Sequence, residues 1–345
     1  MQLFNSHKLI YLYAVLLLTI FIFFGLELLL GSIHIPLRSI LSILFGGAAE
    51  KESWKVIIID SRLPRAIAAI LSGSALAVAG LKMQTLFRNP LAGPYILGIS
   101  SGAGLGVAIF MMGLSFMGIF GSVSPDSGII VSSVLGSFLV LMILLSIINR
   151  LKDIMTVLIL GIMIGSIITA LIGIIQYFSY DAQLKSFILW TMGDLSAISN
   201  DQLLLIAPVV VAGLLFSFTL SKNLNAYLLG EDYAKSLGVN VKRSRIMIIF
   251  ITSILTGTIT AYCGPIGFVG IVVPHLARLI SNSSDHRILI PLCILLGINI
   301  LLIADIVSQL PGMDQALPIN SITSLIGIPF IIWIIFKNKK ITELN

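Results

Sequence analysis

Charged residues are scarce in this sequence. Only 10% of its 345 residues are Asp, Glu, Lys or Arg, whereas a soluble globular domain carries roughly a quarter. This deficit excludes a chain whose main solvent is water. Cysteine is scarce as well, because only Cys263 and Cys293 are present, and neither has a second Cys or His at metal-ligand spacing. We therefore expect no disulfide framework and no zinc or other metal site.

A nucleotide-binding motif is also missing. No GxxxxGK[ST] phosphate loop occurs in the chain, so this polypeptide is not expected to bind ATP by that route. Any ATP and Mg²⁺ would be used by a separate ATPase, and we expect no cofactor on this chain. The net charge of +6 could suggest nucleic acid, but the distribution of the basic residues indicates membrane topology instead.

Apolar residues make up 57% of the sequence and gather in long runs. A bilayer core about 30 Å thick needs about 20 apolar residues per helix. Helices are expected because unpaired backbone groups are costly in lipid and the runs lack the alternation of a transmembrane barrel. The first run is too long for a signal peptide, and no cleavage pattern follows it. The predicted spans are 9–30, 66–87, 95–113, 128–148, 154–178, 200–220, 244–263, 266–281, 288–308 and 321–336.

The basic residues predict the orientation of these spans. With the N-terminus in the cytoplasm, 15 of the 21 Lys and Arg residues fall on the cytoplasmic side, and five of the other six lie in residues 31–65. Cytoplasmic loops carry such an excess in membrane proteins. We predict an all-α integral membrane protein, one transmembrane domain over residues 1–345, with about ten helices and both termini in the cytoplasm.

Glycines recur at spacings that allow close helix packing. The run 98–106 contains a double GxxxG pattern, and Gly161 and Gly165 form another. Such faces let helix backbones approach each other. We favour packing inside one bundle over a specific dimer face.

The run from Cys263 to Pro274 contains three glycines and two prolines within an apolar region. Proline removes a backbone donor and breaks or kinks a helix, so irregular backbone here must be buried in protein or line a cavity. Interrupted helices of this kind often mark a transport route. For His275, which follows this run, a structural hydrogen bond is expected rather than metal binding.

The longest polar cytoplasmic segment runs from residue 221 to 245. Its pattern predicts two short helices hinged at Gly238, with Glu231 at the N-terminus of the first. The apolar Ala234 and Leu237 could anchor a partner protein. A solvated connector explains the periodicity equally well.

Motifs rich in glycine, proline and fixed polar residues recur between Arg62 and Phe330, within a resemblance that runs from about residue 9 to 337. They are Arg62-Leu-Pro-Arg65; Gly80 with Gln84; Arg88-Asn-Pro-Leu-Ala92, Pro94 and Leu97-Gly-Ile-Ser-Ser-Gly-Ala103; Trp190-Thr-Met-Gly193; Leu229-Gly230, Ala234 and Leu237-Gly238; Gly267-Phe-Val-Gly270, Pro274-His275 and Arg278; and Leu317-Pro318, Thr323, Leu325-Ile-Gly327 and Pro329-Phe330. At these residues the chain resembles the permease family of iron-siderophore, haem and cobalamin ABC importers, known as type II importers. The motifs are specific for the family and not for its substrate.

The resemblance implies a homodimer with a translocation path at the dimer axis. It also implies two ATPase subunits on the cytoplasmic face and a substrate-binding protein on the other side. Arg62 and Arg65 would pair with carboxylates of the binding protein, since exposed cations steer an acidic partner; the alternative is interfacial anchoring near the second helix. The implied ATPase-coupling residues are Leu229, Gly230, Glu231, Ala234, Leu237 and Gly238. The implied gating or structural residues are Asn89, Pro90, Gly98, Gly102, Gly267, Gly270, Pro274, His275 and Arg278.

The chain departs from the family pattern near the predicted external mouth. The family commonly has Glu-Leu-Pro followed by a glycine before the last span, where this chain has Ala316-Leu-Pro-Ile-Asn320. A third outward arginine of some members is replaced by Gln309. Glu27 and Asp305 lie near the outer ends of their spans, where snorkelling or local pairing is expected rather than a proton relay.

The sequence thus predicts the permease of an ATP-driven importer in a bacterial cytoplasmic (inner) membrane, carrying a ferric siderophore, haem or cobalamin, with iron compounds ranked first. The alternatives are an ion-coupled secondary transporter and an intramembrane enzyme. The first would need titratable groups near the midplane, of which the sequence offers few. The second would need a polar catalytic set, and the Ser, His and Asp residues show no recognised catalytic spacing.

Overall fold

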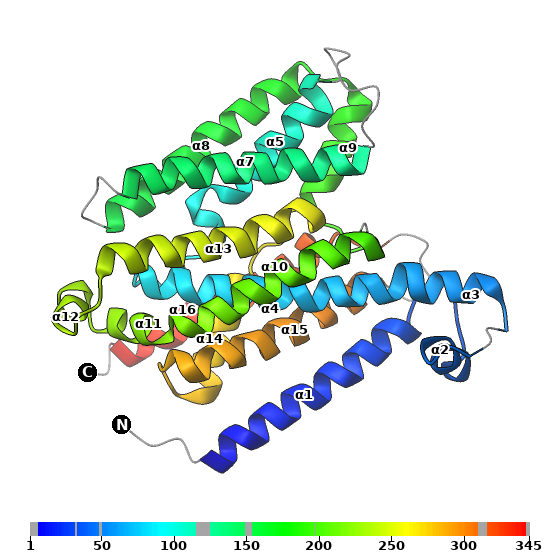
Figure 1. The fold of residues 1–345 in the computed structure, drawn as a ribbon, viewed down its shortest axis with the longest axis horizontal. Coiled ribbons are helices and arrows are strands. Elements are labelled where there is room, and N and C mark those ends of the chain that lie inside the picture. The colour runs from blue at the N-terminus through cyan, green and yellow to red at the C-terminus, as the bar shows by residue number, and fades with distance from the viewer. Residues whose placement is uncertain are drawn as a thin grey trace.

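Long apolar helices lie side by side through the molecule (Figure 1). The computed structural model describes residues 6–31, 33–47, 50–114, 125–148, 154–196, 198–309 and 316–342. The apolar helices are α1 (Ser6–Leu29), α4 (Leu63–Leu86), α5 (Ile99–Ala108), α7 (Pro125–Ile148), α8 (Ile154–Tyr177), α10 (Asn200–Thr219), α13 (Val241–Cys263), α14 (Val269–Ser281), α15 (His286–Ser308) and α16 (Ile319–Thr342). Each coincides with one predicted span, within a few residues at the ends.

Seven helical stretches of the described residues are long and apolar enough to cross a bilayer, and α5, α14 and α16 add shorter apolar helices. The helix α5 continues through a π-helical turn, Ile109–Leu114. The chain is therefore a multi-pass membrane protein, and the predicted all-α bundle is confirmed.

Shorter helices connect the long ones. They are α2 (Leu37–Leu44), α3 (Glu52–Val56), the π-helix η1 (Ile57–Arg62), the 3-10 helix η2 (Pro94–Leu97), α9 (Asp181–Thr191), α11 (Ser221–Leu228) and α12 (Glu231–Ser236). The pair α11 and α12 lies at the end of the bundle where α1 begins and α16 finishes, whereas α2 and α3 lie at the other end (Figure 1). This arrangement agrees with an even number of crossings and with both termini on the side of α12, which we call the cytoplasmic end.

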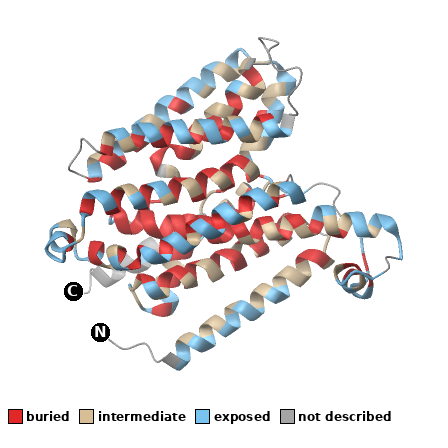
Figure 2. Ribbon diagram, viewed as in Figure 1, coloured by how far each residue is buried: buried red, intermediate tan, exposed pale blue. Residues whose placement is uncertain are grey.

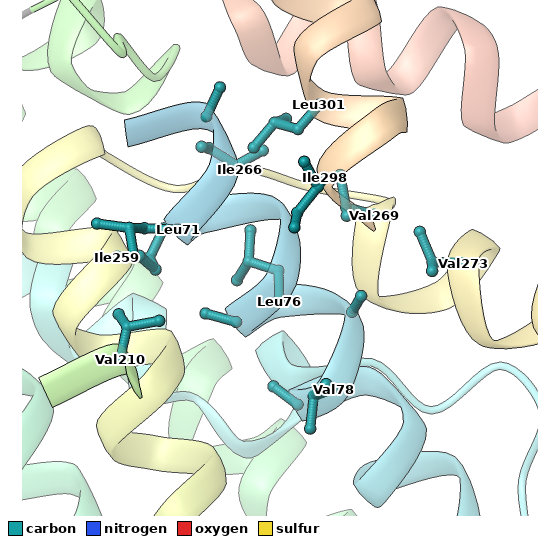
Figure 3. Close-up of a cluster of buried hydrophobic side chains, with 14 of the residues drawn as sticks. Leu71, Leu76, Val78, Val210, Ile259, Ile266, Val269, Val273, Ile298 and Leu301 are labelled. Carbon is teal, nitrogen blue, oxygen red and sulfur yellow. The ribbon is translucent and has the colours of Figure 1, made fainter. Parts of the chain in front are cut away.

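The helix α4 is the centre of the bundle (Figure 2). Of the most apolar stretch of residues 52–86, 89% is buried inside the protein, against 0% of the corresponding stretch of α1. Leu71 and Leu76 of α4 belong to one buried apolar cluster that also includes residues of α10, α13, α14 and α15, among them Val210, Ile259, Val273 and Leu301 (Figure 3). The many alanines and glycines of α4 allow this crowding, because small side chains let neighbouring helices approach on all sides.

Glycines at the helix crossings leave no room for a side chain. A Cβ atom on Gly102 of α5 would lie 2.6 Å from the carbonyl oxygen of Gly136 in α7. A Cβ on Gly98 would lie 3.2 Å from the carbonyl oxygen of Gly161 in α8. Both glycine patterns predicted from the sequence therefore pack inside the bundle, as expected.

The interrupted run between α13 and α14 forms a buried turn. Gly264 has φ +71° and Phe268 has φ +64°, so the chain reverses through left-handed backbone. Cys263 and Ile266 are buried. The amide of Gly267 donates to Oδ1 of Asn320 at 3.0 Å. The prediction that this irregular backbone is buried in protein is confirmed.

Candidate functional site

The short helix α12 stands between two left-handed glycines. Gly230, with φ +105°, separates α11 from α12, and Gly238, with φ +80°, ends α12. The side chain of Asn240 then accepts a hydrogen bond from the amide of Arg243 at 3.0 Å and caps α13. The predicted second short helix after Gly238 is wrong, because this cap starts the long helix α13 at Val241.

An ion pair fastens α12 to α13. Nη2 of Arg245 lies 2.7 Å from Oε1 of Glu231, and the two side chains are 5% and 25% exposed. The hydroxyl of Tyr227 in α11 donates to the carbonyl oxygen of Val241 at 2.9 Å. Burial, together with the nearby charge of Glu231, raises the pKa of Tyr227 to about 12, so the hydroxyl keeps its proton. The helix α12 is thus joined to α13 by an ion pair, and α11 is joined to the start of α13 by a hydrogen bond.

Large apolar side chains are exposed around α12. Leu229, Tyr233 and Leu237 are 62%, 52% and 58% exposed. A contiguous exposed apolar patch is typical of a protein interaction site. Ala234, predicted as an anchor for a partner, is instead fully buried in the protein's own core, because it lies on the face of α12 that packs inward. Leu237 lies on the exposed face, as an anchor requires.

The cytoplasmic ends of α4 and α14 are joined by side-chain hydrogen bonds. Arg278 donates through Nη1 to Oε1 of Gln84 at 2.5 Å, and Gln84 donates to the carbonyl oxygen of Ile271 at 3.0 Å. Nε2 of His275 lies 2.8 Å from the carbonyl oxygen of Pro90. The predicted structural hydrogen bond of His275 is confirmed. The motif residues Gln84, Pro90, His275 and Arg278 therefore meet in space.

The neighbouring motif residues shape turns and close helix contacts of the local backbone. Oδ1 of Asn89 accepts from the amide of Leu91 at 2.9 Å, which shapes the turn after α4. Gly80 of α4 faces the carbonyl of Gly270 in α14, where a Cβ atom would collide with it. Pro274 lies within α14 and is buried.

A second polar network at this end was missed by sequence reasoning. The side chain of Asn225 donates to Oδ1 of Asp285 at 2.7 Å and its Oδ1 lies 2.7 Å from Nδ1 of His286. Nε2 of His286 lies 2.7 Å from the hydroxyl of Thr85 in α4. Burial disfavours the Asp285 carboxylate, but the hydrogen bonds from Asn225 and from the amide of Arg287 outweigh it and hold the pKa below its usual range. No motif spacing joins these residues, because they come from three helices.

At the opposite end of the bundle, the side chain of Arg62 forms hydrogen bonds within the protein. Its guanidinium donates to the carbonyl oxygens of Leu28, Leu29 and Ile33 at 2.7, 3.1 and 2.5 Å. It is 6% exposed. These contacts fasten the end of α1 to the start of α4; docking of a binding protein and interfacial anchoring both stay predictions for Arg62.

Arg65 forms a buried cluster with two carboxylates. It is bidentate to Asp305, with Nε to Oδ2 at 2.8 Å and Nη2 to Oδ1 at 2.7 Å, and Nη2 also donates to Ser308 at 3.0 Å. Nε lies 3.8 Å from Oε1 of Glu27, which also accepts from Nε2 of Gln309. The predicted local pairing of Glu27 and Asp305 is confirmed. The pairing leaves Arg65 13% exposed.

A cavity of about 520 Å³ opens beside this cluster. Arg65, Asp194 and the backbone around Ala316 line it. Of the departures from the family pattern, Ala316 lines this cavity, whereas the side chain of Asn320 holds the α13–α14 turn through the amide of Gly267.

Lys82 lies deeper than its sequence position suggested. We placed it on the cytoplasmic side, but its side chain is fully buried between α4 and α10, with Nζ 2.9 Å from the hydroxyl of Ser217. The predicted span 66–87 already contained Lys82, and α4 reaches Leu86, so this charge lies within a helix and not in a cytoplasmic loop.

The described residues form a multi-pass helical bundle in which the exposed short helix α12 is joined by an ion pair to the long apolar helix α13. The model of the FecCD transport family matches residues 17–337. A hemin transport system permease of Yersinia pestis is 34% identical over 90% of this chain and 91% of its own length. A vitamin B12 import system permease of Klebsiella pneumoniae is 35% identical over 83% of this chain and 84% of its own.

Archaeal and structural relatives extend this result. An ABC transporter permease of Methanocaldococcus jannaschii is 34% identical over 98% of this chain and 97% of its own. The solved inward-facing conformation of an ABC transporter assigned to the metal-chelate type superposes with a TM-score of 0.82 at 27% identity, over 95% of this chain and 99% of that one. The chain belongs to the FecCD transport family. It is the permease of an ABC transporter and has no catalytic role of its own.

Proposed function

We propose that this permease belongs to an ATP-driven importer for a ferric siderophore, haem or cobalamin. The observation that carries the proposal is the family match over residues 17–337, together with a hemin and a vitamin B12 permease among the relatives. Iron compounds rank first. The substrate-binding protein would make most of the selection, because a wide path that binds weakly discriminates little.

The working unit would be a homodimer with two ATPase subunits and one binding protein, in a bacterial cytoplasmic membrane. ATP and Mg²⁺ would be bound by the ATPase. It would grip the exposed side chains around α12, and the Glu231–Arg245 pair would pass the movement to α13. Tilting of packed helices would then open the path alternately to either side.

At the outer mouth, Arg65 is the candidate contact for the binding protein, since it borders the 520 Å³ cavity. Its bidentate bond to Asp305 means that an incoming carboxylate would compete with an internal one. Arg62, with its guanidinium turned to backbone carbonyls, would act by holding α1 against α4. The residues Asn89, Gly98, Gly102, Gly267 and Gly270 would serve the gate by keeping the helix crossings close.

Uptake in liposomes tests the proposal. The permease would be reconstituted with an ABC ATPase and a substrate-binding protein from the same organism, and uptake of radiolabelled haem, ferric siderophore and cobalamin measured with ATP on the ATPase side. We expect uptake of one compound class that requires ATP, the ATPase and the binding protein. Uptake by the permease alone, driven by a proton or sodium gradient, would contradict the proposal and favour a secondary transporter.

A further inference from the structure

A basic pocket lies at the cytoplasmic end, beside α12. It encloses about 430 Å³, and its polar lining includes Arg88, His275 and Arg278. Among the described residues, neither arginine has a carboxylate within 4.0 Å. Arg278 has Gln84 as its side-chain partner, and His275 is turned to a carbonyl oxygen. The pocket therefore carries positive charge that the described part of the chain does not neutralise.

The backbone around this pocket is unusual. The described residues include three non-glycine residues with positive φ, and two of them, Arg88 with φ +47° and Asn282 with φ +46°, line the pocket. Such conformations are strained for residues with a Cβ and cluster at binding and switch sites. The left-handed turn at Arg88 directs the chain away from the end of α4 and leaves its side chain exposed.

The pocket is continuous with the surface around α12. Leu228, the last residue of α11, lies at the pocket, and a Cβ atom on Gly230 would lie 3.6 Å from Nη1 of Arg88. Next to Gly230 come the exposed side chains of Leu229 and Tyr233. A protein that covers α12 therefore reaches Arg88.

We propose that this pocket receives a carboxylate side chain of the ATPase subunit, through the guanidinium of Arg88 with Arg278 behind it. The inference rests on the proposed function. A guanidinium binds a carboxylate through two parallel hydrogen bonds, which fixes orientation as well as adding affinity. The pocket would thus set the register of the ATPase, while Leu229, Tyr233 and Leu237 supply the apolar contact. An anionic lipid headgroup is the competing occupant, but α12 beside the pocket carries the water-exposed pair Asp232 and Lys235.

Binding of an ABC ATPase from the same organism, of the class that serves such importers, tests the proposal. The permease in nanodiscs, as wild type, Arg88→Glu, Arg88→Lys and Lys222→Glu, would be titrated with that ATPase. Lys222 is the matched control, since it is exposed at the far end of α11. We expect Arg88→Glu to weaken binding at least tenfold, Arg88→Lys to weaken it less, and Lys222→Glu to leave it within about twofold. Size-exclusion profiles and melting temperatures check that each variant is folded.

A charge reversal on the ATPase completes the test. Acidic surface residues of the ATPase would be changed to arginine one at a time, and we expect one such change to restore binding to Arg88→Glu. Equal affinity of wild type and Arg88→Glu, or equal losses in Arg88→Glu and Lys222→Glu, would overturn the inference. Loss of stabilisation by phosphatidylglycerol in Arg88→Glu, with ATPase affinity unchanged, would assign the pocket to lipid instead. If wild type itself does not bind the ATPase, the proposed function fails along with the inference.

Discussion

The ion pair between α12 and α13 permits a quantitative test of coupling. Glu231→Gln keeps the shape of the side chain but removes its charge, and Arg245, 5% exposed, loses its carboxylate partner at 2.7 Å. A hydrogen bond to a charged group contributes about 1.5–3 kcal/mol, and breaking a fully buried pair costs about 3–5 kcal/mol. Because Glu231 is 25% exposed, solvent compensates part of the loss, and we expect about 2 kcal/mol.

This cost would appear as local opening of α12. About 2 kcal/mol corresponds to about a 30-fold change in an equilibrium constant, so hydrogen exchange of the α12 amides should quicken by that factor while α4 stays protected. ATP hydrolysis per substrate transported should rise, because the ATPase then moves a helix that is loosely joined to α13. Asp232→Asn is the matched control: Asp232 is 98% exposed and paired with Lys235 at 58% exposure, so no change in exchange is expected. Unchanged α12 exchange and unchanged coupling in Glu231→Gln would refute the role given to this pair.

Three further outcomes follow from the structure. Gly80→Leu should prevent folding, because the carbonyl of Gly270 occupies the space that the new side chain would need. Gly25 has open space around it, so Gly25→Leu should yield normal amounts of monodisperse protein by size-exclusion chromatography. Gly238→Val should be inserted normally but lose ATP-driven uptake, since φ +80° strains a branched residue although no neighbour blocks it; normal uptake would argue against the assigned hinge. The pKa of Asp285 is lower in the folded protein than in the unfolded chain. Its contribution to stability is therefore complete above the ordinary carboxylate range and is lost as the pH falls through the folded-state pKa. The melting temperature of wild type should fall over that pH range, and that of Asp285→Asn should depend less on pH.

Apolar runs were sufficient to locate the helices that cross the bundle. Runs near 20 residues have few alternatives in lipid, so even the short helix α14 was predicted within a few residues. The small amphipathic pieces α2, α3, α9 and α11 were not predicted, because their length and composition resemble loops. Gly238 was correctly predicted to interrupt the helical structure, but Asn240 was not recognised as the residue whose side chain caps α13.

Some features of the candidate site could also be predicted from the sequence, and others could not. The glycines at close helix crossings could be predicted, because the absence of a side chain is itself what lets two helix backbones approach. The partners of charged residues were not: nothing in the spacing shows that Arg62 faces carbonyl oxygens, that Lys82 reaches Ser217, or that Ala234 turns inward. These depend on which helix faces which, and hydropathy carries no information about that.

The enclosure of α4 by other helices has a consequence for how this protein senses its surroundings. Helices in contact with acyl chains tilt or shift when the hydrophobic thickness of the bilayer changes. Because α1 faces outward and α4 is enclosed, lipid composition acts on α4 only through its neighbours. The central helix α4 is therefore shielded from the bilayer, and the outer helices are the ones that adjust to membranes of different thickness.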